Sequence, residues 1–275
     1  MIDDLLVVIV LYKITLKESL SFKTLLDSVS SAQKISLYVY DNSPSKSADK
    51  LLYNNVSVKY VHDQNNGGIS KAYNSAAKYA ALQGKKWLLL LDQDSSLPVG
   101  FLDKIQNDIV KFPNENLFVP VLQQNNLILS PCKFRFMKGS ALNKINAGIF
   151  PLEGHSVFNS GIIIKLSEFS KVGGYDENIP LDFSDHCFIH RFKKHNKNVV
   201  VMPVSIEHEL SSHSNDKGVI FRRFNQYCFG VKRYAETEGG GGWLFFWTLL
   251  RAIKLTLKFR DLAFLEVFFK TKREL

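Results

Sequence analysis

The sequence is poor in cysteine and has no long hydrophobic run. Its three cysteines, Cys132, Cys187 and Cys228, are odd in number, widely separated and form no Cys-x-x-Cys pair. This pattern excludes a disulfide framework and a cysteine zinc site, and it favours reduced thiols in a cytoplasmic protein. No basic segment precedes the short apolar run near the N-terminus, so we expect neither a signal peptide nor a membrane-spanning start.

Two common nucleotide-binding motifs are also absent. The glycine loop QNNGGISKAYNSA (64–76) lacks the GK[ST] ending of the phosphate loop in nucleotide hydrolases. The N-terminal region has no GxGxxG, the motif that binds dinucleotide cofactors. The sequence therefore favours neither of these enzyme classes.

Positive charge is abundant but unevenly distributed. The 275 residues carry a formal net charge of +9, and from Lys217 onward twelve Lys or Arg stand against five Asp or Glu. A uniformly basic surface would suggest nucleic acid, whereas a basic tail on a near-neutral body suggests a local partner such as a membrane face. We therefore expect no nucleic-acid partner.

Short apolar stretches alternate with amphipathic ones over the first two hundred residues. The first few are unbroken, as in strands buried on both faces of a parallel sheet, and helix-like segments over 19–31 and 69–82 lie between them. This order predicts an α/β fold with a mostly parallel central sheet flanked by helices. The expected strands are VVIVLY (7–12), LYVY (37–40), VSVKYV (56–61), WLLLL (87–91), LFVPV (117–121), GIIIK (161–165) and VVVM (199–202).

Two regions depart from this order. Residues 123–158 are polar and rich in turn residues, and we expect an irregular excursion over the site. After residue 211 the pattern becomes helical, with a glycine hinge at EGGGGW (238–243).

Paired carboxylates follow the most apolar of the expected strands. In LLLLDQDSS (88–96), Asp92 and Asp94 stand at a strand's carboxyl end, where ligands bind in α/β sheets. If the chain stays extended there, both side chains face the same side. Two close carboxylates favour a divalent cation such as Mg²⁺ or Mn²⁺, with a phosphate ligand completing its coordination. The alternative is a solvated turn.

Other polar residues occupy similar places. Asp41 ends the strand of YVYDNSPS (38–45), and the glycine loop offers Asn66, Gly68, Lys71 and Asn74 before a helix. A glycine loop and a helix start can both approach an anion, so these four residues are candidates for nucleotide binding, although such a loop by itself is more often a plain strand–helix turn.

Two later segments hold candidate catalytic groups. In GGYDENIPLDFSDHCFIHR (173–191), Ser184 can cap a helix with Asp185 in its first turn, and Asp182 lies just before. The helix dipole alone can explain an aspartate there. His208 follows the last expected strand, as a metal ligand or a structural histidine.

Taken together, these segments resemble the inverting family-2 glycosyltransferases with the GT-A fold, and within them the rhamnosyltransferase-like branch. The similarity spans roughly residues 5–235, and LDQDS and HEL point to the rhamnosyl branch. The similar stretches, in the family's order, are VVIVLY, YDNSPS, NNGGISKAYNSA, LLLLDQDSS, NSGIIIKLSEFSKVGGYDE, LDFSDHCFIHR and IEHELS.

The resemblance implies a role for each matched residue. Asp41 would contact the nucleotide base, and Asp92 would lie near the ribose and the metal. Asp94 and His208 would bind Mg²⁺ or Mn²⁺. Asp185 would be the general base that deprotonates the acceptor hydroxyl. The implied donor is a nucleoside-diphosphate sugar, with dTDP-rhamnose favoured over a UDP-sugar, and the implied acceptor is a glycan or lipid-linked glycan of a bacterial surface.

The sequence departs from the family at two places. Ser184 stands where many members have Glu, and Asp182 is a candidate to compensate for it. The Arg-Asn pair of a later helix has its nearest counterpart in RRFNQY (222–227), so Arg222 and Arg223 are candidate acceptor-side residues. From the 123–158 excursion and the residue after it, we add His155 and Asn159 to the expected acceptor contacts.

The resemblance divides the chain into a GT-A catalytic domain over 1–211 and a helical extension over 212–275. The nucleotide-binding half would cover about 1–96 and the acceptor side about 97–211. The extension carries a basic, aromatic-rich amphipathic helix. This predicts either contact with an anionic membrane surface, which would place the protein peripherally on the inner face of the cell membrane, or a helix hairpin packed on the domain or on a second subunit of a homodimer.

Two rival functions stay open. A nucleotidyltransferase usually has a basic glycine-rich N-terminal signature, which VVIVLYKITLKES lacks. A non-catalytic sugar-nucleotide binder or membrane scaffold is the other.

Overall fold

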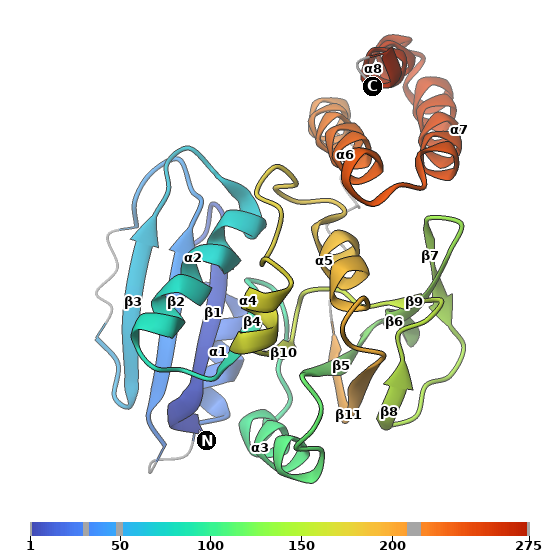
Figure 1. Ribbon diagram of the computed structural model, residues 1–275. Coiled ribbons are helices and arrows are strands. Elements are labelled where there is room, and N and C mark those ends of the chain that lie inside the picture. Colours follow the sequence, from blue (N-terminus) through green and yellow to red (C-terminus); the bar gives the residue numbers. More distant parts are fainter. Residues whose placement is uncertain (1, 30–32, 48–51, 208–215, 274–275) are drawn as a thin grey trace.

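The computed structural model describes residues 2–29, 33–47, 52–207 and 216–273 (Figure 1). The strands are β1 (Leu5–Leu11), β2 (Ile35–Asp41), β3 (Val56–His62), β4 (Trp87–Asp92), β5 (Leu117–Gln124), β6 (Leu127–Arg135), β7 (Lys138–Leu142), β8 (Gly148–Pro151), β9 (His155–Ser156), β10 (Ile162–Lys165) and β11 (Asn198–Glu207). The helices are η1 (Ile2–Asp4, a 3₁₀ turn), α1 (Leu20–Asp27), α2 (Gly68–Leu82), α3 (Phe101–Lys111), α4 (Leu166–Lys171), α5 (Ser184–Phe192), α6 (Lys217–Glu238), α7 (Gly241–Phe259) and α8 (Ala263–Arg273).

The strands form one mixed sheet in the order β3-β2-β1-β4-β10-β5-β11-β8. The first four strands pair in parallel, which confirms the βαβ reading of the N-terminal half. β10 then runs antiparallel to both β4 and β5, so parallel pairing returns only between β5 and β11. The carboxyl ends of β1, β2, β4, β5 and β11 consequently lie along one edge of the sheet.

Both faces of the sheet are buried under helices, as the unbroken apolar strands predict. Every residue of β1 is buried, and alternate side chains enter different cores because successive side chains of a strand point to opposite faces. One core includes Tyr73 of α2 and Phe188 of α5. The other includes Phe22 of α1 and Phe101 of α3.

The expectation of an irregular excursion over 123–158 is wrong. Within it, β6 pairs with β5, β7 and β9, while β8 pairs with β11, so most of this segment extends the sheet. The β6–β7 hairpin turns at Phe136 and Met137, both with positive φ (51° and 58°). Such a turn usually has Asn or Gly, so its sequence carries no hairpin signal.

The C-terminal residues form a bundle of three helices beside the sheet (Figure 1). Phe224, Ala252 and Phe264 bring α6, α7 and α8 together in one apolar cluster. A second cluster joins Val231 of α6 and Leu244 of α7 to Cys187 of α5. The helical extension therefore packs directly on the helix that carries Asp185.

Candidate functional site

The two carboxylates of the DQD segment do not lie on one extended strand. β4 ends at Asp92, and Gln93 and Asp94 form a turn. The Gln93 side chain accepts a hydrogen bond from the Tyr12 amide at 2.8 Å, which ties this turn to the end of β1. The turn, and not strand alternation, sets the relative orientation of Asp92 and Asp94.

The DQD turn adjoins the end of β11. The Ser96 amide donates to the Glu207 carbonyl at 3.4 Å, and these two residues form an isolated bridge. His208, the expected metal ligand, comes next in the chain and lies outside the described residues. This pairing brings Asp94, two residues before Ser96, to the strand end from which His208 follows.

Asp92 belongs to a buried polar network. Tyr73 of α2 directs its hydroxyl at the Asp92 carboxylate, 3.4 Å away. The Tyr73 and Tyr175 rings are in contact, with centroids 5.1 Å apart. The Tyr175 hydroxyl donates to the side-chain oxygen of Asn159 at 2.6 Å, and the side-chain nitrogen of Asn159 donates to the Ser184 hydroxyl at 3.4 Å.

This network ends beside Asp185, the residue after Ser184. Burial raises the pKa of Tyr73 well above its usual value, with Asp92 and then Asp185 adding to the rise. Burial likewise raises the pKa of Tyr175, followed by Asp185 and Asp92. Both phenols therefore stay protonated and able to donate. The contacts from Tyr73 to Ser184 thus lead from the Asp92 carboxylate to the residue before Asp185.

Asp185 lies in the first turn of α5, as expected. The predicted Ser184 cap is wrong, because Ser184 is already helical and Phe183 occupies the cap position with φ 73°. An Asp185 oxygen accepts from the His186 amide at 2.7 Å. The His186 ring is held by the Ser156 hydroxyl at 2.7 Å.

Asp182 is packed under the helical extension. Arg223 of α6 approaches its carboxylate at 3.7 Å, and the other carboxylate oxygen is buried without a hydrogen bond. Burial raises the pKa of Asp182, while Arg223 and Arg251 oppose the rise and Asp185 adds to it. Gly230 of α6 packs so closely that an added Cβ would lie 2.6 Å from the Asp182 carbonyl oxygen.

Asp41 ends β2, as predicted, and is almost fully buried. One carboxylate oxygen accepts from the Ser43 amide at 2.8 Å and the other from the Tyr60 hydroxyl at 2.5 Å. The neighbouring Asn42 is 3% exposed, and its side-chain oxygen has no hydrogen-bond partner. Asn42 is thus a buried polar group beside Asp41 that our sequence reasoning did not single out.

The glycine loop is organised by Asp63, which we did not single out from the sequence. Asp63 pairs with Lys71 at 2.8 Å and also accepts from the Tyr40 hydroxyl at 2.7 Å. The Lys71 hydrogen bond is the main reason that the pKa of Asp63 falls to about 2. Lys71 therefore neutralises a buried carboxylate of its own loop, and Asn66 stands in the same loop with φ 51°.

The start of α2 contacts protein groups. The Ile69 amide donates to the Pro180 carbonyl at 2.8 Å, across the close approach made by Gly68. The Asn74 side chain donates to the Tyr175 carbonyl at 2.9 Å and accepts from the Tyr175 amide at 2.8 Å. In this structure Asn74 positions Tyr175, a role that the sequence pattern did not reveal.

The other residues that we predicted to contact the acceptor do not lie together. The His155 ring packs against Phe150, with centroids 4.6 Å apart, and its Nδ1 lies 3.1 Å from the Pro151 carbonyl. Arg222 is exposed on α6. Of the two arginines in RRFNQY, Arg223 is the one that reaches Asp182.

The carboxylates offer the oxygen donors that Mg²⁺ and Mn²⁺ prefer. In the described ranges, no three His, Cys, Asp or Glu side chains form a ready-made metal cluster. Of the three predicted ligands, Asp92 and Asp94 are among the described residues and His208 is not.

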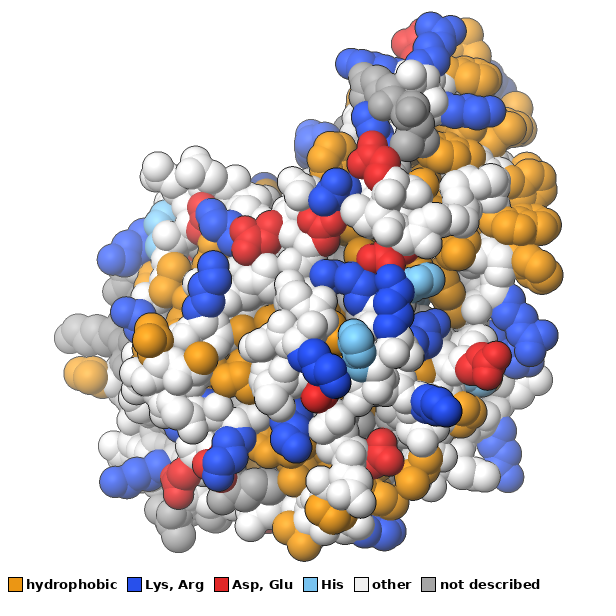
Figure 2. Space-filling view, viewed as in Figure 1, with side chains coloured by type: hydrophobic (Ala, Val, Ile, Leu, Met, Phe, Trp, Pro, Cys, Tyr) orange, Lys and Arg blue, Asp and Glu red, His pale blue; other side chains and the backbone are white. Residues whose placement is uncertain are grey.

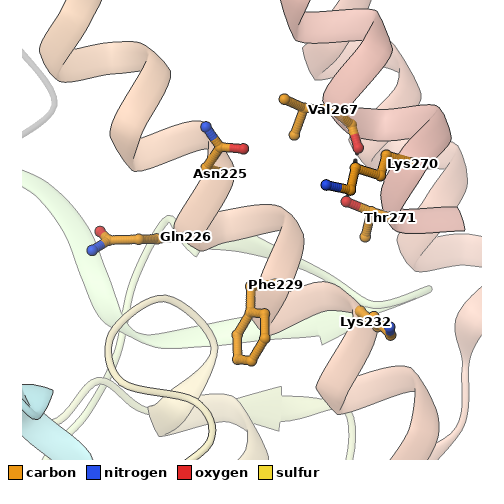
Figure 3. Close-up of a pocket in the computed structure, with 7 residues that line it drawn as sticks. All are labelled: Asn225, Gln226, Phe229, Lys232, Val267, Lys270 and Thr271. Atoms are coloured by element: carbon orange, nitrogen blue, oxygen red, sulfur yellow. Dashed lines mark hydrogen bonds between the residues drawn. The ribbon is translucent and has the colours of Figure 1, made fainter. Parts of the chain in front are cut away.

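A surface cavity of about 410 Å³ lies between α6 and α8, lined by residues such as Phe229, Lys232 and Lys270 (Figure 3). These residues come from the helical extension, and none comes from the sheet edge that carries Asp92. The cavity is therefore separate from the candidate active site.

Comparisons with known proteins identify the fold. Residues 14–126, less than half of the chain, match the glycosyl transferase family 2 profile. No curated protein sequence matches the chain. This part of the chain is therefore similar to family 2 glycosyltransferases, and the chain as a whole has the GT-A fold.

Solved structures resemble the fold over most of its length. S. aureus TarS 1-349 aligns over 88% of this chain and 68% of its own, with 13% identity and a TM-score of 0.57. The chain spans only 41% of the longer S. aureus TarS structure. The mannosyltransferase PcManGT from Pyrobaculum calidifontis, solved with GDP-Man and Mn²⁺, aligns over 94% of this chain and 74% of its own, with 11% identity and a TM-score of 0.55. At these identities the likeness shows the fold alone.

Proposed function

We propose that this protein is a metal-dependent inverting glycosyltransferase with Asp185 as its general base. The observation that carries the proposal is the chain of contacts that runs from Asp92, at the end of β4, through buried tyrosine and asparagine side chains to Ser184, the residue before Asp185. A family 2 domain on a GT-A fold supports the same reaction.

In this proposal the nucleoside diphosphate sugar lies across the carboxyl ends of β1, β2 and β4. Asp41 and Asn42 face the base, Asp92 lies near the ribose, and Asp94, Asp92 and His208 hold Mg²⁺ or Mn²⁺. When bound, the cation stabilises negative charge on the leaving diphosphate.

The protein's own contribution to chemistry is the proton transfer. Asp185 accepts the proton of the acceptor hydroxyl as that oxygen attacks the anomeric carbon opposite the leaving group.

The network from Tyr73 to Ser184 gives these groups a fixed geometry. Its rings and hydroxyls are buried, and Asn74 holds the Tyr175 backbone at both its amide and carbonyl. Reacting groups held in this way lose less freedom in the transition state.

The favoured donor is dTDP-rhamnose, with transfer to a hydroxyl of a bacterial surface glycan. A UDP-sugar is the second candidate donor, because structures of the similar TarS 1-349 are complexes with UDP and UDP-GlcNAc. A thermal-shift series with dTDP-rhamnose, UDP-sugars and GDP-mannose, with and without Mn²⁺, separates these donors. Selective stabilisation by dTDP compounds supports rhamnose, and a response to uridine nucleotides alone rules it out.

The catalytic role is tested with Asp185→Asn. We expect metal-dependent transfer or donor hydrolysis to fall at least about a hundredfold, as for loss of a general base, while Mn²⁺-dependent nucleotide binding survives. Asp103→Asn is the matched control, because Asp103 also lies in the first turn of a helix but is exposed on α3. Unchanged turnover in Asp185→Asn would contradict the assignment. Nucleotide binding without any turnover in the wild type would favour the non-catalytic binder.

A further inference from the structure

One face of α7 is apolar and uncovered. Trp243, Phe246, Leu250, Ile253 and Leu257 recur at steps of three and four residues, so they lie on the same side of the helix. Each keeps a large part of its surface exposed, from 40% at Ile253 to 74% at Leu257. Figure 2 shows apolar side chains gathered along the outer edge of the C-terminal bundle.

The β6–β7 hairpin extends this face with Phe136. We call the five exposed apolar residues of α7 and Phe136 together the α7 stripe. Phe136 is 63% exposed, and its ring lies 4.9 Å from that of Trp243. The Trp247 indole donates to the Phe136 carbonyl at 2.9 Å. The hairpin turn, whose two residues have positive φ, is thus held by α7 with an aromatic side chain directed outward.

The side chains that flank the stripe on α7 include basic residues and no acidic residue. The sequence has no Asp or Glu from Gly239 to Arg260. Lys254 and Lys258, each one position after a stripe residue, are exposed along its flank. Lys138 lies over the Trp247 ring, 4.2 Å from its centroid. The apolar face therefore has a positively charged border.

We propose that the α7 stripe and its lysines dock the protein on an anionic membrane surface. A helix with Trp, Phe and Leu on one face and basic residues beside them lies in the headgroup region, where apolar burial and attraction to anionic lipids act together. None of the described helices is long and apolar enough to cross a membrane.

The lysines beside the α7 stripe argue against a second copy of the protein as its binding partner. In a two-fold contact the same patch meets itself, so the lysines beside the stripe on two α7 helices would be brought together, and the sequence from Gly239 to Arg260 holds no Asp or Glu. An anionic lipid surface presents the opposite charge to these lysines.

The docking surface also lies close to the reaction centre. α7 carries Arg251, which packs 4.1 Å over the Tyr227 ring and acts on the Asp182 carboxylate near Asp185. If the proposed function holds, docking places the acceptor side next to the lipid surface, and a lipid-linked glycan becomes the fitting acceptor.

Vesicle co-sedimentation of the full chain tests the docking without any requirement for sugar transfer. We expect binding to phosphatidylcholine vesicles that contain about one-third phosphatidylglycerol, weak binding to pure phosphatidylcholine, and weakening by added salt. Because the assay does not measure transfer, an inactive protein that binds vesicles would refute the proposed function and leave the docking intact.

Two double variants separate the apolar and charged contributions. Lys254→Gln with Lys258→Gln should weaken vesicle binding about 30-fold, since each lysine near an anionic surface contributes about a factor of five. Phe246→Ser with Leu250→Ser should weaken it by about tenfold or more through lost apolar burial. The matched controls, Lys78→Gln with Lys111→Gln and Leu82→Ser with Val110→Ser, alter exposed residues of α2 and α3 and should bind as the wild type does.

Light scattering of the same proteins decides between lipid and a second copy. A wild-type monomer that binds anionic vesicles supports the proposal. A dimer that Phe246→Ser with Leu250→Ser converts to a monomer, with vesicle binding absent or equal in all variants, overturns it. A normal melting temperature in each variant excludes unfolding as the cause of lost binding.

Discussion

Gly68, at the start of α2, packs against the segment around Pro180 that leads to Asp182, and Gly68→Ala tests this contact. Gly68 has φ +83°, and an added Cβ would lie 2.4 Å from the Pro180 carbonyl oxygen and 2.8 Å from its Cα. These are backbone atoms, so a side-chain rotation cannot relieve the overlap. Either α2 or the segment that leads to Asp182 must move.

Gly84 provides a matched control for the backbone strain. It follows the same helix with φ +65°, and an added Cβ there meets nothing within 4 Å. Both alanines carry the left-handed strain of about 1 kcal/mol, but only Gly68→Ala adds an overlap that costs about 1–3 kcal/mol. We therefore expect Gly68→Ala to melt roughly 3–10 °C below Gly84→Ala, at about 2–4 °C per kcal/mol.

Gly68→Ala should lower the rate of sugar transfer by more than its loss of stability alone would explain. Displacement of Pro180 shifts the segment that carries Asp182 and Asp185, so transfer should fall in Gly68→Ala at a temperature where the variant is fully folded. Differential scanning calorimetry and a donor-hydrolysis assay, run on both variants, measure the two effects. Equal melting temperatures and equal turnover for the two alanine variants would refute the close contact between α2 and the Pro180 segment.

Two further perturbations follow from the buried polar groups. The pKa of Asp63 is lowered to about 2, so its pairing with Lys71 stabilises the fold at pH values above the unfolded-state pKa near 4. We therefore expect the unfolding free energies of the wild type and Asp63→Asn to differ by about 2 kcal/mol at pH 7. This difference, measured by urea unfolding, should narrow as the pH falls from 4 towards 2. A gap that is independent of pH would contradict the pairing with Lys71. Tyr175→Phe leaves the buried Asn159 oxygen without its 2.6 Å donor and should cost about 1–3 kcal/mol and lower kcat, whereas Tyr73→Phe, which loses only a 3.4 Å contact, should cost less. The reverse order in thermal melts and steady-state kinetics would show that the network does not connect the two carboxylates as described.

Strand positions were predictable because their signal is local. The buried strands β1 and β4 consist almost entirely of Leu, Val and Ile, and such runs fit only a strand covered on both faces. The aspartates that end β2 and β4 were also visible, since a carboxylate directly after an apolar run is unusual. What the local pattern could not give is the direction of β10, whose apolar run is equally compatible with parallel or antiparallel pairing.

The hairpin over residues 127–142 was missed for a different reason. Its turn residues, Phe136 and Met137, adopt left-handed φ values that Asn or Gly would normally supply. The conformation is stabilised from elsewhere in the chain, by Trp247 at the Phe136 carbonyl and by the packing of Met137 with Gly240. No window of sequence around the turn contains these partners.

The residues that join Asp92 to Asp185 were hidden because they resemble ordinary core residues. Tyr73 falls in the middle of an amphipathic helix, and Tyr175 falls in a glycine-containing turn, so both positions predict packing. Only the sheet order, with β10 antiparallel beside β4, brings Asn159 and Ser160 against the end of β4, where the Ser160 hydroxyl lies 3.3 Å from the Asp92 amide. The carboxylates were identifiable from their sequence positions, but their common centre exists only because four segments distant in the chain meet at one edge of the sheet. A sequence that kept every aspartate but changed the register of β10 would keep the motifs and lose the site.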